Sequence, residues 1–136
     1  MKNFIISFFL LLLPTHTLAE IVVIGNIKNS QQQLTAVQVQ DIYMGRTRTF
    51  PDRKFAYPFD QTDLRGEFYL KLTQRPVAQI NAYWARLMFS GKTSPPTKLP
   101  DDQSIIEIVK KHEGAIGYIN KENIDEQTMH ILLILE

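Results

Sequence analysis

Short apolar runs alternate with segments of helical periodicity, and this alternation constrains the fold of the 136-residue chain most strongly. Ile21 to Ile24 form a continuous apolar run closed by Gly25, which is typical of a strand buried on both faces, as in a parallel sheet. Further strands are predicted over 55–59, within 114–119 and over 129–135. Strands separated by helical stretches favour an α/β sandwich over an all-α or all-β domain.

Four helices are predicted from their start and stop signals. Thr35 fits an N-cap, Gln38 completes a capping box, and Gly45 fits a C-cap. A second helix is expected over about 62–72, a third from Pro76 to Gly91, and a fourth capped by Asp101 or Asp102. Pro58 places the second strand near an edge or at its own end, and 92–100 is expected to be a loop.

The amino-terminal segment predicts a cleavable secretory signal peptide over residues 1–19. Lys2 supplies the positive charge, Phe4 to Leu13 form the apolar run, and Thr17-Leu18-Ala19 offers small residues for cleavage before Glu20. The alternative is a membrane anchor, but the run is about half of the roughly 20 residues that a spanning helix needs. Residues 20–136 are therefore expected to form one periplasmic or secreted domain.

Composition narrows the chemistry of that domain. The chain has no cysteine, and without Lys2 it holds 14 basic and 14 acidic residues, so no general attraction to nucleic acid is expected. His112 and His130 are the histidines of the segment 20–136, and their spacing matches no metal site. No catalytic triad, phosphate loop or dinucleotide motif is present. We therefore expect a protein that is not an enzyme, with neither a cofactor nor a metal.

The segment around Asp60, Gln61, Thr62 and Arg65 is the strongest candidate for a ligand site. It lies where a predicted strand ends and a predicted helix begins, and free N–H groups at such a junction attract anions. Thr62 can offer its hydroxyl, Arg65 can bind an oxyanion through two N–H groups, and Asp60 can accept a proton or orient Arg65. The alternative is that Thr62 only caps the helix and that Asp60 and Asp63 only complement its dipole.

Two other polar or aromatic groups have simpler explanations. The connection between the first helix and the second strand is basic and can collect anions or dock a partner, although a solvated loop explains it as well. Its charged residues are Arg46, Arg48, Arg53 and Lys54. Tyr83, Trp84 and Phe89 can form an aromatic platform, but their helical spacing favours a core position for Trp84.

Two ordered motifs resemble phosphate-type periplasmic substrate-binding proteins. The segment 34–46, LTAVQVQDIYMGR, is similar to the family's LT-x-x-Q-L-x-x-IF-x-G helix, and 114–119, GAIGYI, resembles its GAIGY turn and strand. The segment 82–91 is similar to that of short, single-lobe members. The resemblance implies a single periplasmic-binding-protein-like lobe, with a mixed sheet flanked by helices. It also implies non-catalytic binding of phosphate or a similar small oxyanion, in connection with ABC transport.

The same resemblance shows what this chain lacks. Full-length members have two lobes that close on the oxyanion, and a Ser-Gly-Thr turn in one lobe contacts phosphate. Here Asp60-Gln61-Thr62-Asp63 takes that place, so Thr62 is the one matching hydroxyl. One lobe can bury phosphate only if a second copy or another protein supplies the opposite wall.

Two hypotheses follow, with different structural consequences. In the first, the module binds a small oxyanion weakly or as a homodimer, and Thr62 and Arg65 converge on an exposed pocket. In the second, it is a ligand-free accessory module that docks onto a membrane sensor or transporter. The second hypothesis predicts that Arg65 is held in an internal ion pair and that an apolar surface patch lies elsewhere. A small secreted enzyme would instead require His112 or His130 to meet a nucleophile.

Overall fold

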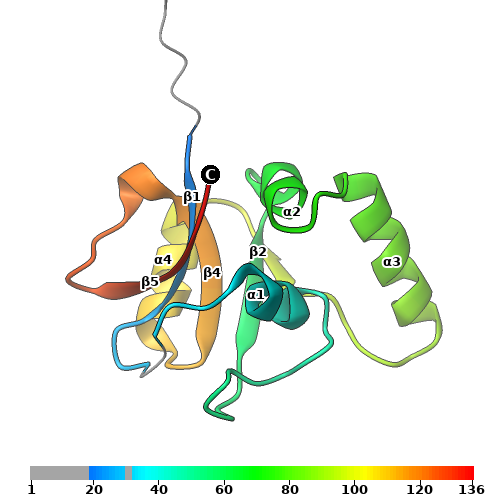
Figure 1. Ribbon diagram of the computed structural model, residues 1–136, viewed down its shortest axis with the longest axis horizontal. Coiled ribbons are helices and arrows are strands. Elements are labelled where there is room, and N and C mark those ends of the chain that lie inside the picture. The colour runs from blue at the N-terminus through cyan, green and yellow to red at the C-terminus, as the bar shows by residue number, and fades with distance from the viewer. Residues whose placement is uncertain (1–18, 30–31) are drawn as a thin grey trace, which may run out of the picture.

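The computed structural model describes residues 19–29 and 32–136, so residues 1–18 of the predicted signal peptide lie outside the described residues. The described chain forms a five-stranded mixed sheet with helices on both faces (Figure 1). In chain order the elements are β1 (Ile21–Asn26), α1 (Ala36–Tyr43), β2 (Tyr57–Gln61), α2 (Arg65–Thr73), α3 (Val77–Phe89), β3 (Thr97–Leu99), α4 (Asp102–Lys111), β4 (Ala115–Asn120), a short 3-10 helix (Lys121–Asn123) and β5 (Met129–Leu135). The expected α/β class is confirmed. None of these helices reaches the length and apolarity that crossing a membrane requires.

The strand order is β3-β2-β4-β1-β5, and it combines parallel and antiparallel pairs. β2 runs parallel to both β3 and β4, whereas β1 runs antiparallel to β4 and β5. β1 is buried on both faces, as predicted, but the parallel surroundings expected for it are wrong. Helices cover both faces of the sheet here, so a continuous apolar run does not reveal the direction of the neighbouring strands.

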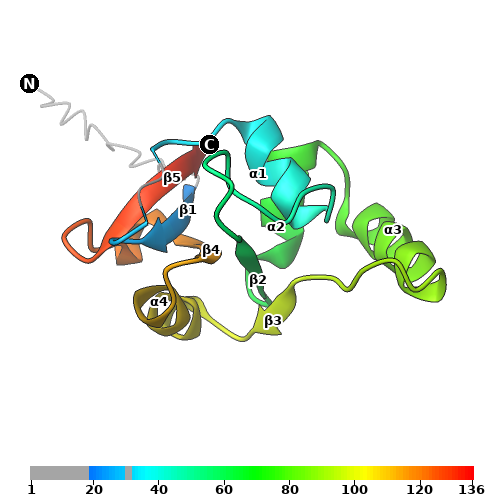
Figure 2. The same cartoon turned by 90° about the horizontal axis from the view of Figure 1, so that it is seen from below.

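The core consists of two apolar layers, one on each face of the sheet. Ile21 and Val23 of β1 point into the layer beneath α1, α2 and α3, and Val22 and Ile24 point into the layer beneath α4. Figure 2 shows α4 on the face opposite α1 and α2. This alternation follows from the two-residue period of a strand.

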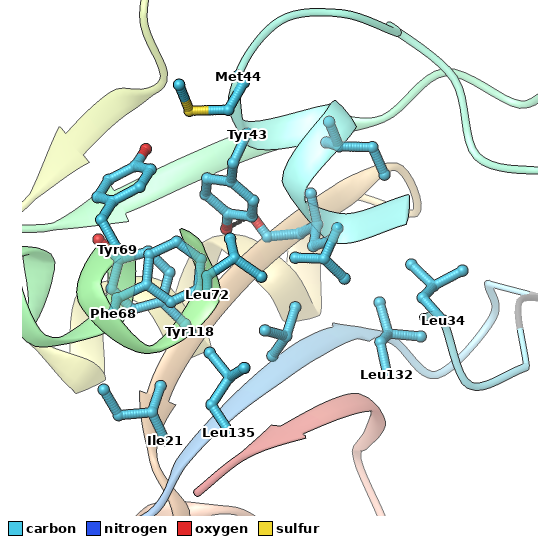
Figure 3. Packing of buried hydrophobic residues seen from close by; sticks show 14 of the residues in the cluster. Ile21, Leu34, Tyr43, Met44, Phe68, Tyr69, Leu72, Tyr118, Leu132 and Leu135 are labelled. Carbon is cyan, nitrogen blue, oxygen red and sulfur yellow. Dashed lines mark hydrogen bonds between the residues drawn. The ribbon is translucent and has the colours of Figure 1, made fainter. Parts of the chain in front are cut away.

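Aromatic rings fill the layer beneath α1 and α2 (Figure 3). The rings of Phe68 and Tyr118 stack with centroids 3.6 Å apart, and Tyr43 meets the edge of Phe68 at 4.8 Å. Tyr69 lies beside them on α2. Three of these four rings carry hydroxyl groups, so this apolar layer also brings polar atoms inside the protein.

The local signals at α1 and α4 are confirmed. Thr35 accepts a hydrogen bond from the N–H of Gln38, whose side chain accepts one from the N–H of Thr35, so the capping box is complete. Gly45 follows α1 with φ of +71°, the left-handed conformation that ends many helices. Asp101 caps α4 by accepting from the N–H of Ser104.

Two boundaries differ from the sequence prediction. α2 begins at Arg65 rather than about Thr62, and its N-cap is Leu64, which makes no side-chain capping bond. Thr62 therefore does not cap the helix. The segment expected to be a loop over 92–100 contains β3, which is too short to show a period.

Of the two positions predicted from Pro58, a strand near an edge or the strand's own end, the structure shows the second: Pro58 is the second residue of β2. β2 is an interior strand, but at Pro58 it pairs only with β4, because pairing with β3 begins at Phe59. A residue without an N–H is tolerated at such a position. β5 pairs with β1 and so completes the main sheet.

Candidate functional site

The carboxyl ends of β2, β3 and β4 meet at one edge of the sheet. These three strands are parallel, and α2 and α4 begin just beyond the ends of β2 and β3. The predicted site residues lie at this edge: Asp60 and Gln61 end β2, Thr62 lies in the turn, and Arg65 opens α2. In open α/β sheets this edge is where ligands bind.

Asp60 is fully buried and accepts hydrogen bonds from three side chains. The hydroxyls of Tyr69 and Tyr118 each donate to it at 3.0 Å, and Arg65 Nε donates at 3.2 Å. Burial raises the pKa of the Asp60 carboxyl, although the Tyr69 hydroxyl, the Arg65 charge and the Tyr118 hydroxyl all act to lower it. Burial also raises the pKa values of Tyr69 and Tyr118, and the nearby Asp60 charge adds to this effect. These groups therefore form a buried polar network.

Arg65 is largely committed to neighbouring side chains. Its side chain is only 11% exposed, its Nη1 donates to Asn81 Oδ1 at 2.6 Å, and its guanidinium carbon lies 5.3 Å from the centroid of the Tyr69 ring. The bonds to Asp60 and Asn81 use two of the five N–H donors of an arginine. Arg65 can still donate to a further group, but Asp60 offsets its charge.

Gln61 and Thr62 face different surroundings. Gln61 is buried, and its side-chain amide donates to Asp102 Oδ1 at 2.7 Å and to the Tyr118 carbonyl at 3.0 Å. Thr62 is exposed, its N–H donates to the Leu99 carbonyl at 2.9 Å, and its hydroxyl makes no hydrogen bond to any residue that the structure describes. The structure thus brings Asp60, Gln61 and Arg65 into one network and leaves the Thr62 hydroxyl available.

A hollow of about 450 Å³ lies at the same edge. Its lining is acidic and polar and does not include Thr62 or Arg65. The lining residues are Gln61, Asp63, Asp101, Asp102, Gln103, Ile106, Asn120 and Asn123. The Asp102 carboxylate already accepts from Gln61, Asn120 and Asn123. The pairing of Arg65 with Asp60 is the arrangement expected under the docking hypothesis.

Sequence reasoning missed three members of the network: Tyr69, Tyr118 and Asn81. Tyr69 and Tyr118 occupy positions where the periodicity of the sequence predicts a buried apolar side chain, on a helix and on a strand. The only signal for a polar role was that each carries a hydroxyl group. His112 and His130 lie apart in the chain, at the C-cap of α4 and in β5. Within the described ranges, no group of three or more histidine or acidic side chains is arranged to hold a metal ion.

Comparison with solved structures finds the same fold in phosphate-binding proteins. A phosphate ABC transporter substrate-binding protein from Clostridium perfringens, solved with bound phosphate, superposes with a TM-score of 0.64 at 20% identity, over 84% of this chain and 45% of that one. An ABC-type phosphate transport receptor from Vibrio cholerae gives 0.63 at 13% identity, over 84% and 46%. PstS from Borrelia burgdorferi gives 0.56 at 14% identity, over 84% and 47%.

No family model matches the sequence, and no curated protein matches it. The chain spans less than half the length of each of these solved relatives. The fold expected from the resemblance is confirmed. The described chain has the α/β fold of phosphate-type substrate-binding proteins over the matched part of their length, with a five-stranded mixed sheet flanked by helices.

Proposed function

We propose that this chain is a non-catalytic, periplasmic-binding-protein-like module that binds a small oxyanion, such as phosphate, at the junction between β2 and α2. The observation that carries the proposal is the combination of a Thr62 hydroxyl that makes no hydrogen bond among the described residues and an Arg65 held in place at a helix start without a side-chain cap. The shared fold with phosphate-binding proteins supports it. The predicted signal peptide supports a location in the periplasm or outside the cell.

The expected affinity is low. Asp60 offsets the charge of Arg65, and the carboxylates of Asp63, Asp101 and Asp102 line the neighbouring hollow, so the net field does not favour an anion. A single lobe also leaves one side of the ligand in water. We expect a dissociation constant of about 1 mM for the isolated lobe, and tighter binding where a second copy or a transporter component covers the site.

Calorimetric titration of the protein with phosphate, with sulfate for comparison and a parallel mass determination, tests the proposal. Arg65→Ala is a poor probe because it leaves Asp60 buried and unpaired. Thr62→Val removes an exposed hydroxyl that has no partner in the described part of the chain, and it is expected to weaken phosphate binding about tenfold or more. Thr97→Val removes a comparable hydroxyl from β3 and serves as the control. Equal phosphate affinity in both variants contradicts the site.

A second function, docking onto a membrane sensor or transporter, is favoured by three specific observations. Arg65 is held in an internal ion pair, and the exposed rings of Phe55 and Tyr57 lie side by side with centroids 6.5 Å apart. Phe89 at the end of α3 is 97% exposed. If phosphate gives no saturable heat at millimolar concentrations, docking is the better account. Phe55→Ser with Tyr57→Ser should then abolish co-purification with a membrane partner.

A further inference from the structure

We infer that the end of the molecule beside the start of β2 is a docking surface for a membrane that contains anionic phospholipid. Three segments meet there: the loop after β1, the hairpin before β2 and the turn between α4 and β4. In Figure 1 they lie together at the lower end of the molecule, opposite α2 and the C-terminus. This inference does not depend on the oxyanion site, which lies at the other end of β2.

Hydrogen bonds fasten the loop after β1 to the end of α4. The Asn26 side chain is buried and donates to the Lys110 carbonyl at 3.1 Å. The Asn29 side chain is also buried and donates to the Glu113 carbonyl at 3.1 Å. These two bonds fix the loop against the last turn of α4 and the turn that follows it.

The hairpin of residues 48–56 packs against the same turn. The Tyr57 N–H, just after the hairpin, donates to the Gly114 carbonyl at 2.8 Å. A Cβ on Gly114 would stand 2.6 Å from the Phe55 carbonyl oxygen and 2.9 Å from the Tyr57 ring, so only glycine allows this close contact. The three segments therefore form one continuous surface.

The apolar part of this surface consists of exposed side chains. Phe55 and Tyr57 are each more than half exposed, with ring centroids 6.5 Å apart, and Ile27 in the loop after β1 is exposed as well. Aromatic rings, especially those with a polar tip, gain free energy at the boundary between lipid headgroups and acyl chains. A membrane surface would therefore cover side chains that the protein itself leaves in water.

Lysines from all three regions surround these rings. Two of them line a hollow of about 150 Å³ together with both rings, and the one carboxylate in that lining belongs to Glu113. At the tip of the hairpin, the charges of Asp52 and Arg53 offset each other. Two more lysines are exposed in the last turn of α4. The lysines of this surface are Lys28, Lys54, Lys110 and Lys111.

The distribution of charge favours lipid over protein as the partner. Residues 20–136 hold equal numbers of basic and acidic side chains, so the whole protein is not attracted to an anionic surface. Lysine is depleted in protein–protein interfaces, whereas lysines beside apolar side chains are typical of surfaces that bind anionic membranes. Asp63, Asp101 and Asp102 lie at the opposite end, which such a membrane repels. The hairpin therefore faces the lipid and the oxyanion site faces away from it.

Co-sedimentation with protein-free vesicles tests the inference. The segment 20–136 contains every described helix and strand and lacks the apolar run at residues 4–13, which would itself bind lipid. This protein should sediment with vesicles of equal parts phosphatidylglycerol and phosphatidylcholine. Binding should be at least about tenfold weaker to pure phosphatidylcholine, or in about 0.5 M salt, because both remove the electrostatic attraction. No binding to the phosphatidylglycerol vesicles overturns the inference and leaves a protein as the partner of this surface.

Two matched pairs of lysines make the assignment specific. Lys110→Gln with Lys111→Gln should weaken vesicle binding about tenfold or more. Lys92→Gln with Lys98→Gln removes the same charge from exposed positions between α3 and the end of β3, and should change binding less than about twofold. Equal losses in the two double variants would show attraction by net charge alone and overturn the inference.

The aromatic rings have a control of their own. Phe55→Ser with Tyr57→Ser should weaken vesicle binding about tenfold, whereas Met88→Ser with Phe89→Ser, at the exposed end of α3, should leave it unchanged. Equal effects of these two double variants also contradict the assignment. Thr62→Val should bind the vesicles like the unchanged protein, so this surface and the oxyanion site succeed or fail separately.

Discussion

The two ends of β2 differ in whether the buried polar groups beside them have hydrogen-bond partners. At the carboxyl end, the fully buried Asp60 carboxylate receives hydrogen bonds from Tyr69, Tyr118 and Arg65. At the amino end lies a hollow of about 270 Å³, lined in part by Trp84 and Thr97. The buried indole N–H of Trp84 and the Thr97 hydroxyl have no partner among the described residues. A satisfied network stabilises the fold and leaves few donors for a ligand, whereas a buried donor without a partner lowers stability, because it loses its bond to water without replacement.

The largest effect is expected from breaking the ion pair at the carboxyl end. Arg65→Ala leaves the Asp60 carboxylate buried and without its positive partner, and should lower the free energy of unfolding by about 3 kcal/mol. Urea unfolding measures this change. Arg46→Ala removes a partner from the exposed pair with Asp41 and should cost less than about 1 kcal/mol. Similar decreases in the free energy of unfolding in both variants would show that the buried ion pair contributes no more to stability than the exposed one.

The next largest effect is expected from removing one hydroxyl of the network. The Tyr118 hydroxyl donates to Asp60 and accepts from the N–H of Gln61, both at 3.0 Å. Tyr118→Phe therefore leaves two buried polar groups short of a bond and should lower the free energy of unfolding by about 2 kcal/mol. Tyr57→Phe, at a ring that is 57% exposed, provides the control and should change stability little. A neutral Tyr118→Phe would mean that Asp60 is satisfied without it.

The raised pKa of Asp60 predicts a specific pH dependence of stability. Because burial makes protonation easier in the folded state, the associated stabilisation is fully present below the ordinary carboxyl pKa of 3.8 and is lost as pH rises through the raised value. The stability of the protein relative to Asp60→Asn should therefore increase as pH falls from neutral into this window. Unfolding midpoints at several pH values measure the difference.

Asp101 supplies a control of opposite sign. Hydrogen bonds from Ser104 lower the pKa of the Asp101 carboxyl. The stabilisation of the folded state by this carboxylate is therefore present above pH 3.8 and is lost as pH falls through the lowered pKa. Relative to Asp101→Asn, the protein should become less stable on acidification. The same direction of change for both aspartates would contradict the burial-based explanation for Asp60.

The smallest effect is expected at the amino end of β2. The Thr97 hydroxyl lines the hollow and has no partner among the described residues. Thr97→Val keeps the branched side chain that suits a strand and should change the free energy of unfolding by less than about 0.5 kcal/mol. Urea unfolding of Thr97→Val and Tyr118→Phe under the same conditions compares the two changes in the free energy of unfolding directly. A loss of more than 1 kcal/mol would reveal a bond that the hydroxyl makes in solution.

Much of the fold could be predicted from sequence because its signals are local. The capping box of Thr35 and Gln38, the cap at Asp101 and the left-handed Gly45 each depend on a few neighbouring residues. Thr62 misled the prediction of α2 because it has the chemistry of a cap, although the turn after β2 continues as far as Leu64. β3 was missed because it has only three residues, next to prolines, and is too short to show the two-residue alternation of a strand.

The site was harder to predict because its contacts are distant in the chain. Asp60 meets Tyr69 nine positions and Tyr118 58 positions away, and Arg65 meets Asn81 16 positions away. Composition and spacing identified Asp60 and Arg65 as a candidate pair but did not show that a layer of aromatic rings encloses them. The unpaired donor of Trp84 was likewise hidden, since helical spacing reveals that a residue is buried but not whether its N–H finds a partner.

The most direct test titrates one ¹⁵N-labelled sample with phosphate and follows the signals at both ends of β2. Phosphate should shift the backbone N–H signals of Thr62 and its neighbours and leave the Trp84 indole signal unchanged. If phosphate moves no signal at the β2–α2 junction, or if it also moves the Trp84 indole signal, the proposed oxyanion site is contradicted.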